Sequence, residues 1–398
     1  MRNLMGATVK CFVLLGMAFG VPAAMAATPD IFATVTQPIG VAATQNEVLV
    51  SQPYCVNDGQ TGPISPSRWQ ILKFDPSVNP GPGNTGSLFA ALPSNPDYGP
   101  ASTPGILSNC EETYLAIASG LAGGFPSGNV YATQGGHIYE FNSAGTLLRT
   151  LALIPSLEVP FAHTALVFDT VGTFGNKLIV VGTDSSNFGE IWTVDFSGNA
   201  TKIFTLTGPQ GGPACNGGDA PCFETSEVAP LSGPIGSAFP GSLFLPLTAL
   251  SGIAADIGAL SPSLAFSTPG GVPVPETIHF VPSASPACTF STTNPNNQKT
   301  YQFFNASFST TGSGSLGNTI YAYHPTDFNG LAGQMLVTTE GSAVLVSTDA
   351  NIDYSAFDNA IYDSEGSSFV QCFSLCVCNC PVTPSKLGRD KGIGLLFR

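Results

Sequence analysis

The stretch Ala165–Leu206 constrains the fold of this chain more than any other. It contains four short apolar segments within about forty residues, which is the length of one propeller blade. The segments are rich in Val, Ile, Leu, Thr and Phe, as half-buried strands are, and Gly, Asn and Ser separate them. They are Ala165–Asp169, Lys177–Gly182, Glu190–Asp195 and Ala200–Leu206. The pattern predicts one four-stranded antiparallel sheet.

A second stretch, Thr113–Ile154, repeats this pattern. Its HisIleTyrGluPheAsnSerAlaGly aligns with GluIleTrpThrValAspPheSerGly of the first stretch. Gly136 and Gly145 precede Gly189 and Gly198 by 53 residues in each case. The links ending in Gly145 and Gly198 predict hairpin turns, because Gly and Asn tolerate positive φ. Two matching units predict a repeat architecture.

Fainter copies of the unit extend the repeat along the chain. Segments that begin at Phe174, Phe239 and Leu331 each combine an apolar residue, a small turn and an apolar strand. Residues 68–75 predict a strand of the first blade, and residues 27–50 are expected to complete the last blade and close the ring. The chain is therefore predicted to be an all-β propeller over residues 27–371, with four-stranded antiparallel blades. Six blades are favoured and seven are possible.

The first 26 residues have the pattern of a signal peptide. Arg2 and Lys10 supply positive charge, an apolar core follows, and Ala24–Met25–Ala26 offers small residues for cleavage. No later segment has the roughly 20 apolar residues that a membrane span requires. The prediction is a secreted or periplasmic protein without a membrane span.

Cysteine usage supports the same compartment. Of ten cysteines, Cys11 lies in the leader, and export makes disulfides the default for the other nine. Cys215 and Cys222 could close a loop, and a Cys-rich tail is expected over residues 372–398. An odd number leaves one thiol free or intermolecular, and the connectivity stays open. The disulfide candidates are Cys55, Cys110, Cys215, Cys222, Cys288, Cys372, Cys376, Cys378 and Cys380.

The charge balance excludes one class of partner. With 12 basic and 26 acidic residues, the net charge is −14, whereas nucleic-acid binding requires a clustered basic surface. The same acidity disfavours an anionic membrane surface. A monomer with an unidentified ligand or protein partner is expected.

The spacing of the repeats and the pairing of PheGlyAsnLysLeuIleVal with IleTrpThrValAspPheSerGlyAsn resemble the secreted six-bladed propellers of the NHL, gluconolactonase and strictosidine-synthase-like group. The resemblance covers Glu112–Leu206 best. It implies a fold rather than an activity, because these motifs are shared by many propellers. No segment matches the catalytic positions of that group residue by residue.

Three glutamates stand before successive turn-plus-strand motifs, and they are the candidate metal ligands. Glu112 precedes Phe125, Glu158 precedes Phe174, and Glu227 precedes Phe239. If they occupied equivalent places in successive blades they would converge on the channel, where converging carboxylates can bind Ca²⁺. The alternative is that they lie separately in solvated loops between blades.

The chain has four histidines, of which His163 is the leading candidate for a general base, because it follows Glu158 by five residues. A structural, hydrogen-bonded histidine is the alternative. Three functions are carried forward: a secreted ligand-binding or interaction propeller, a Ca²⁺-dependent lactonase-like hydrolase with its site at the central channel, and an envelope structural protein. The catalytic residues and the cofactor stay unassigned.

Overall fold

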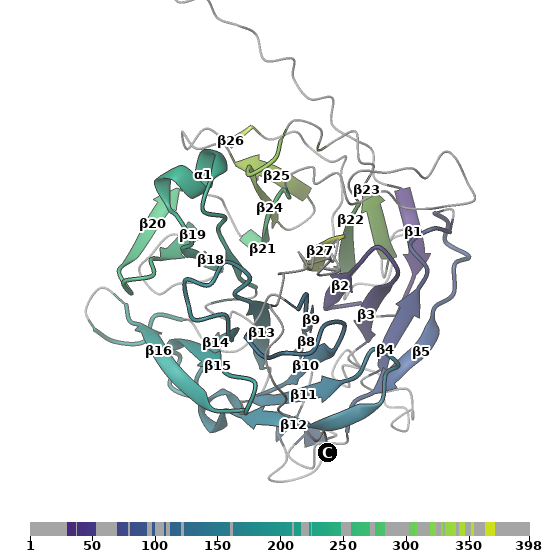
Figure 1. Ribbon diagram of the computed structural model, residues 1–398, viewed down its shortest axis with the longest axis horizontal. Coiled ribbons are helices and arrows are strands. Elements are labelled where there is room, and N and C mark those ends of the chain that lie inside the picture. Colours follow the sequence, from purple (N-terminus) through teal and green to yellow (C-terminus); the bar gives the residue numbers. More distant parts are fainter. Residues whose placement is uncertain are drawn as a thin grey trace, which may run out of the picture.

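The computed structural model shows a ring of small antiparallel sheets around a central channel (Figure 1). It describes residues 30–36, 38–52, 70–78, 80–93, 98–99, 107–108, 112–120, 123–159, 162–208, 211–215, 223, 225–247, 256–270, 275–282, 302–308, 319–323, 328, 331–339, 342–346, 352–353 and 363–370.

Within these residues, six sheets are arranged around the channel, and the innermost strand of each sheet is named first. The first sheet contains β2 (Val41–Ala43), β3 (Val48–Gln52), β4 (Gln70–Phe74) and β5 (Ser87–Ala91). The second contains β9 (Leu115–Ile117), β10 (Val130–Gln134), β11 (His137–Phe141) and β12 (Leu147–Leu153). The third contains β13 (His163–Phe168), β14 (Leu178–Thr183), β15 (Gly189–Val194) and β16 (Ala200–Leu206).

The fourth sheet contains β17 (Glu227–Val228), β18 (Leu243–Leu247), β19 (Asp256–Leu260) and β20 (Phe266–Gly270). The fifth contains β21 (Pro275–Phe280), β24 (Met335–Thr339), β25 (Ser342–Val346) and β26 (Ile352–Asp353). The sixth contains β27 (Asp363–Phe369), β22 (Phe303–Phe308), β23 (Thr319–Tyr323) and β1 (Asp30–Thr34). A separate parallel pair is formed by β6 (Tyr98–Gly99) and β7 (Leu107–Ser108).

The predicted all-β propeller with small antiparallel sheets is confirmed, but the predicted number of four-stranded blades is not. In the described ranges, five sheets have four strands each, against the six or seven expected. The third sheet has a fifth strand, β8 (Glu112–Thr113), which pairs in parallel with the start of β13. The sequence does not signal this strand, because a two-residue parallel pairing leaves no periodicity.

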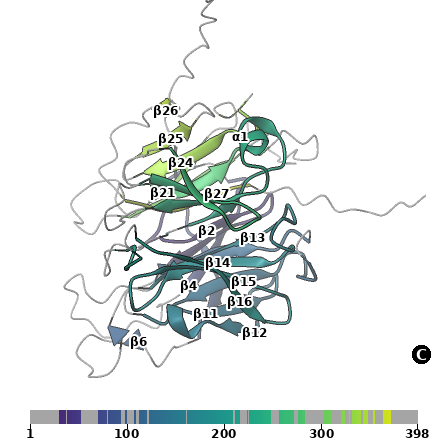
Figure 2. The same ribbon diagram turned by 90° about the vertical axis from the view of Figure 1, so that its left-hand side faces the viewer.

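Ring closure joins the two ends of the described chain. β1 pairs in antiparallel register with β23, so the N-terminal segment supplies the outermost strand of the sixth sheet. Residues 30–34 thus play the closing role predicted for residues 27–50, while Val48–Gln52 belongs to the next sheet. In the side view, β24 and β25 lie at the top and β11 and β12 at the bottom, with β2 between them (Figure 2).

The core of the protein lies between the sheets. Six hydrophobic clusters are found among the described residues, and each combines residues from two neighbouring sheets. One example joins Ile138 of β11 and Tyr131 of β10 to Val180 of β14. Burying a large apolar side chain contributes about 1.5–3 kcal/mol, so each sheet depends on its neighbours for most of its stability.

The two best sequence repeats form the predicted hairpins. Asn142 and Asp195 accept backbone N–H groups of their own turns through Oδ1, and Gly145 and Gly198 have φ values of 80° and 89°. Each glycine also lies against the outermost strand of the preceding sheet. A Cβ on Gly198 would be 2.0 Å from the carbonyl oxygen of Leu151. The glycine therefore serves both the turn and the contact between sheets.

Buried carboxylates tie the outer strands together in both repeats. Glu140 accepts hydrogen bonds from Tyr131 Oη at 2.7 Å and Arg149 Nε at 2.6 Å, and Glu190 accepts one from Lys202 Nζ at 2.6 Å. Burial alone would raise the pKa of both carboxyls, but the hydrogen bonds outweigh it and the pKa of each is lowered. Burial, followed by its bond to Glu140, raises the pKa of the Tyr131 hydroxyl, which stays a donor.

Two short helices interrupt the strands. A 3₁₀ turn, η1 (Pro155–Leu157), precedes β13, and α1 (Gly233–Ala238) lies between β17 and β18 with Pro234 in its first turn. None of the helices in the described ranges has the length and apolar content of a membrane-spanning segment.

Only one of the disulfide candidates lies in the described part of the chain. Cys215 is buried and disulfide-bonded, and its Sγ is 3.8 Å from Thr183 Oγ1. Its pairing with Cys222 stays a prediction. Cys55, Cys110, Cys222, Cys288, Cys372, Cys376, Cys378 and Cys380 lie outside the described residues, as do the leader and the tail.

Two glycine substitutions distinguish the energetic cost of a side chain at positive φ in a turn from the cost of a collision between two sheets. Gly211 has φ +75° with nothing within 4 Å of its Cβ position, so Gly211→Ala carries only the backbone cost, about 1–2 kcal/mol. Gly198→Ala adds the collision with Leu151 and is expected to lower the free energy of unfolding by about 2–4 kcal/mol. Chemical denaturation measures both, and equal losses would contradict the contact.

Acid is expected to weaken the protein through Glu140 and Glu190. A lowered pKa in the folded state means that the carboxylates add stability above their unfolded value of 4.5, and this is lost as the pH falls through the folded value. Glu190→Gln should cost about 1–3 kcal/mol at neutral pH. Its unfolding free energy should then fall less than that of the wild type between about pH 5 and pH 3. Parallel pH profiles in urea titrations would refute this assignment.

Candidate functional site: the central channel

The six innermost strands enclose a cavity of about 390 Å³. All six contribute lining residues, as the propeller prediction requires. The strands can be compared level by level, because the last residue of each pairs with the first residue of its neighbour. These last residues are Ala43, Ile117, Phe168, Val228, Phe280 and Phe369.

The level one residue earlier is divided into two halves. The innermost strands of the first three sheets place Ala42, Ala116 and Val167 there. Those of the last three sheets place Glu227, His279 and Ser368 there, and all six residues line the cavity. We call this level the channel layer. One half of its circumference is therefore small and apolar, and the other half carries the polar groups.

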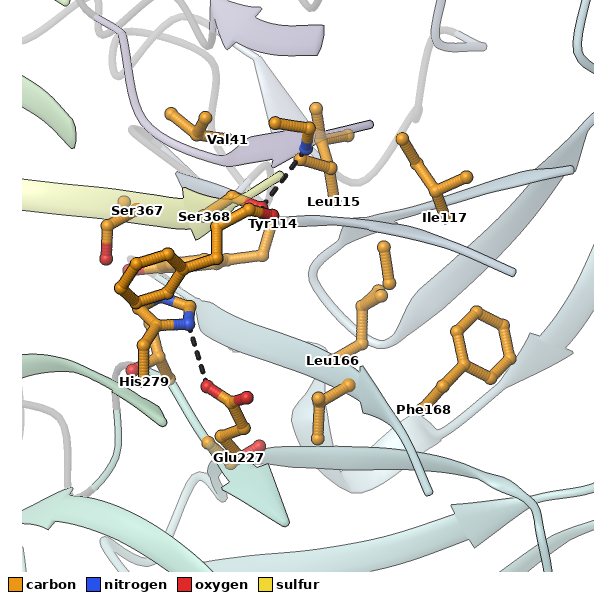
Figure 3. Close-up of a pocket in the computed structure, with 18 of the residues that line it drawn as sticks. Val41, Tyr114, Leu115, Ile117, Leu166, Phe168, Glu227, His279, Ser367 and Ser368 are labelled. Carbon is orange, nitrogen blue, oxygen red and sulfur yellow. Dashed lines mark hydrogen bonds and ion pairs between the residues drawn. The ribbon is translucent and has the colours of Figure 1, made fainter. Parts of the chain in front are cut away.

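The neighbouring levels extend the apolar half. Leu115, Ile117, Leu166 and Phe168 continue it along the channel, and Figure 3 shows them on the opposite side of the cavity from His279 and Ser367. Among the described lining residues, Glu227 and His279 are the only Asp, Glu, His, Lys or Arg side chains. The remaining lining residues are apolar or carry hydroxyl groups, so this pair is the one carboxylate–imidazole contact at the cavity.

Glu227 and His279 form an ion pair between two sheets. The Nδ1 of His279, on β21, lies 2.8 Å from Oε2 of Glu227, on β17. The same carboxylate oxygen accepts the backbone N–H of Phe280 at 3.2 Å. The side chains are 17% and 26% exposed, so the pair is accessible from the cavity while both partners are held in place. Figure 3 shows the contact as a dashed line.

The far side of the His279 ring is closed by aromatic residues. Phe303 and Phe369 meet it edge to face, with ring centroids 5.8 and 6.1 Å away. Its Nε2 is buried and has no hydrogen-bond partner among the described residues. Because Nε2 is buried, the exposed part of the His279 side chain is elsewhere on the residue.

The serines of the polar half are already hydrogen-bonded. Ser368 Oγ accepts the backbone N–H of Ala43 at 3.1 Å and donates to the carbonyl of Phe369 at 3.2 Å. The hydroxyl of Ser367 is bonded to that of Thr277, which also contacts Thr338. These bonds link strands of neighbouring sheets and leave the serines little capacity for a ligand.

The three predicted glutamates do not occupy equivalent places. Glu112 lies on β8, next to His163 at the start of β13, whereas Glu227 is one residue before the end of β17. Glu112 and Glu227 thus lie toward opposite ends of the channel. Glu112 Oε2 accepts the hydroxyl of Tyr114 at 2.6 Å and lies 2.8 Å from His163 Nδ1.

Glu158 is not a lining residue of the cavity. It follows η1, and its Oε1 lies 2.6 Å from Nδ1 of His137, whose ring stacks on Tyr139. His163, expected to share a site with Glu158, is instead paired with Glu112. Each of the three glutamates therefore has a different histidine partner, a pairing that the sequence spacing did not reveal.

The described residues contain no group of three His, Cys, Asp or Glu side chains that could hold a metal ion. Glu112, Glu158 and Glu227 are separated from one another by the geometry above. The assignment of Ca²⁺ to the three glutamates stays a prediction. His324, the fourth histidine, lies outside the described residues.

The channel layer could not be located from the sequence because three of its six members are Ala or Val. The signal that was available is the position of an acidic residue one place before the end of one inner strand and of a histidine at the same place in the next. To use this signal, the last residue of each inner strand must be known, and sequence patterns do not define strand ends to a single residue.

Comparison with known proteins leaves the family open. No family model and no curated protein sequence matches the chain. Similar solved structures include the BP39L lectin from Burkholderia pseudomallei, with 10% identity over 84% of this chain and 71% of that chain, at a TM-score of 0.37. The WD40 domain of Neurospora crassa Pan2 has 7% identity over 87% and 86%, at 0.36. β-Fructofuranosidase from Schwanniomyces occidentalis has 11% identity over 83% and 64%, at 0.40. Similarities this low say nothing about function, and the fold rests on the sheets themselves.

The histidine contacts predict the tautomer of two rings. Nδ1 of His137 and Nδ1 of His279 lie 2.6 and 2.8 Å from a carboxylate oxygen, which can only accept, so the neutral form of each ring should carry its proton on Nδ1. Long-range ¹H–¹⁵N NMR distinguishes the two tautomers. Glu227→Gln should alter the spectrum of His279 and leave those of His137 and His163 unchanged. An Nε2–H tautomer for His279 would contradict the pairing.

Proposed function

We propose that this protein is a ligand-binding propeller whose central channel holds one small organic molecule. The observation that carries this is the divided channel layer: a cavity of about 390 Å³ with an apolar half and an oriented carboxylate. Small-molecule sites typically have this size and this combination of apolar walls with a few fixed polar groups. An unused channel would gain more stability from apolar residues that fill it.

We also infer that the six sheets act as six blades of one ring, as in secreted six-bladed propellers. This is supported by six inner strands that line one channel and by six apolar clusters between neighbouring sheets. Export is proposed on the leader pattern of residues 1–26 alone.

The hydrolase alternative lacks a supporting observation in the described part of the chain. A metal-assisted mechanism needs several ligands that converge on one ion, and the described side chains offer no group of three. The envelope alternative depends on an unpaired cysteine, and all candidates except Cys215 lie outside the described residues. Binding in the channel is the function that the described geometry supports.

A substitution that fills the cavity tests this proposal. Ala116→Phe would place a ring in the apolar half of the channel layer, whereas Ala144→Phe places the same ring on an exposed turn. The probe is a library of neutral, cationic and anionic ring compounds, monitored by ligand-observed NMR. We expect to find compounds that bind both the wild type and Ala144→Phe. Their affinity for Ala116→Phe should be at least tenfold lower. Compounds whose affinity is unchanged by Ala116→Phe would contradict the proposal.

A further inference from the structure

The chemistry of the channel layer restricts the ligand beyond its size. Glu227 Oε2 already accepts the N–H of Phe280 and lies 2.8 Å from His279 Nδ1. Within the described part of the chain, Oε1 has no hydrogen-bond partner, and Glu227 lines the cavity. Ser226 Oγ and His279 Nε2 also have no hydrogen bond, but both atoms are sealed from the cavity. The channel layer therefore presents one strong acceptor to a ligand.

The available partners disfavour an anion. No described lysine or arginine lines the cavity, the hydroxyl of Ser368 already donates to the carbonyl of Phe369, and the hydroxyl of Ser367 is bonded to that of Thr277. A ligand carboxylate would face the carboxylate of Glu227 without donors for its own oxygens. Burying such a charge without partners is costly.

The number of open hydrogen-bond acceptors in the channel layer disfavours an ammonium group. An ammonium has three donors and no acceptor, and among the side chains of the channel layer only Oε1 of Glu227 is an open acceptor. Its other two N–H groups would be turned toward Ala42, Ala116 and Val167, and would lose their hydration without replacement. A hydroxyl has one donor, which matches the single open oxygen.

On these grounds we propose that the channel selects an uncharged cyclic alcohol or phenol. Its hydroxyl donates to Oε1 of Glu227, and its hydrocarbon ring lies against the apolar half formed by Ala42, Ala116 and Val167. His279 is a positioning residue in this arrangement, because it holds Glu227 through Nδ1 and does not touch the ligand. The inference rests on the proposed binding function and adds the chemical class of the ligand.

Four probes with one ring system separate the possible head groups. Tetralin has no polar group, 1-tetralol adds a hydroxyl, 1-aminotetralin an ammonium and tetralin-1-carboxylate an anion. Calorimetric titration of the full chain should show 1-tetralol binding about tenfold more tightly than tetralin, the gain of one hydrogen bond to a charged acceptor. The ammonium and the carboxylate should bind more weakly than the alcohol.

Glu227→Gln tests the acceptor. The amide keeps the shape of the side chain and removes its charge, so the advantage of 1-tetralol over tetralin should fall to about threefold or less. Tetralin itself should bind the variant unchanged, which shows that the apolar half is intact. Glu158→Gln is the matched control: it removes the charge of another histidine-paired glutamate outside the cavity and should leave all four affinities unchanged.

The outcomes separate this inference from the function on which it rests. Equal affinities for tetralin and 1-tetralol, or tighter binding of 1-aminotetralin, would overturn the ligand class while binding in the channel stands. A head-group preference that survives Glu227→Gln would overturn the role of Glu227. If no probe binds in a manner that Ala116→Phe abolishes, both the inference and the proposed function fail.

Discussion

Apolar packing between neighbouring sheets is the interaction on which the rest of this structure depends. A four-stranded sheet has two faces, and a blade of this size cannot bury both by itself. Among the described residues, an apolar cluster therefore lies at each boundary between neighbouring sheets. One example is Phe32 with Phe304 and Phe74, where the sixth sheet meets the first. The channel exists because these contacts close into a ring.

The polar contacts add orientation to this ring. Glu112 with His163 joins β8 to β13 within the third sheet, and Glu227 with His279 joins two neighbouring sheets. Arg149 does the same farther out, where it donates to the carbonyl of Phe196 at 2.6 Å and lies over its ring. Such contacts contribute less than apolar burial, but they are directional, and they fix where each strand ends relative to its neighbour. That alignment decides which side chains share a level of the channel.

The fold could be predicted from the sequence because its strongest signals are local. Gly145 and Gly198 mark turns whose φ values require them, and the segments around Tyr139 and Trp192 have a strand pattern that the structure confirms. The number of four-stranded blades was wrong because β8 joins its sheet through only two residues. A pairing this short depends on the position of the neighbouring sheet and not on its own sequence.

The candidate site could be predicted only in part. The prediction that inner strands line a channel is confirmed, and Glu227 lies in it, but the supposed equivalence of Glu112, Glu158 and Glu227 is not supported by the register. A motif found by sequence spacing records how far a residue is from a turn. The level of a side chain in the channel depends instead on how many residues its inner strand contains, and this varies from sheet to sheet.

The pairing of β1 with β23 has a consequence for how the chain leaves the ring. Because β1 is the outermost strand of its sheet, any segment that precedes Asp30 starts from the rim and not from the axis. A tether or tag attached there would extend from the outer edge of the sixth sheet, on the side of the ring away from the channel. The last sheet also stays one strand short until the beginning of the chain comes back to it, so assembly is complete only when the two ends meet.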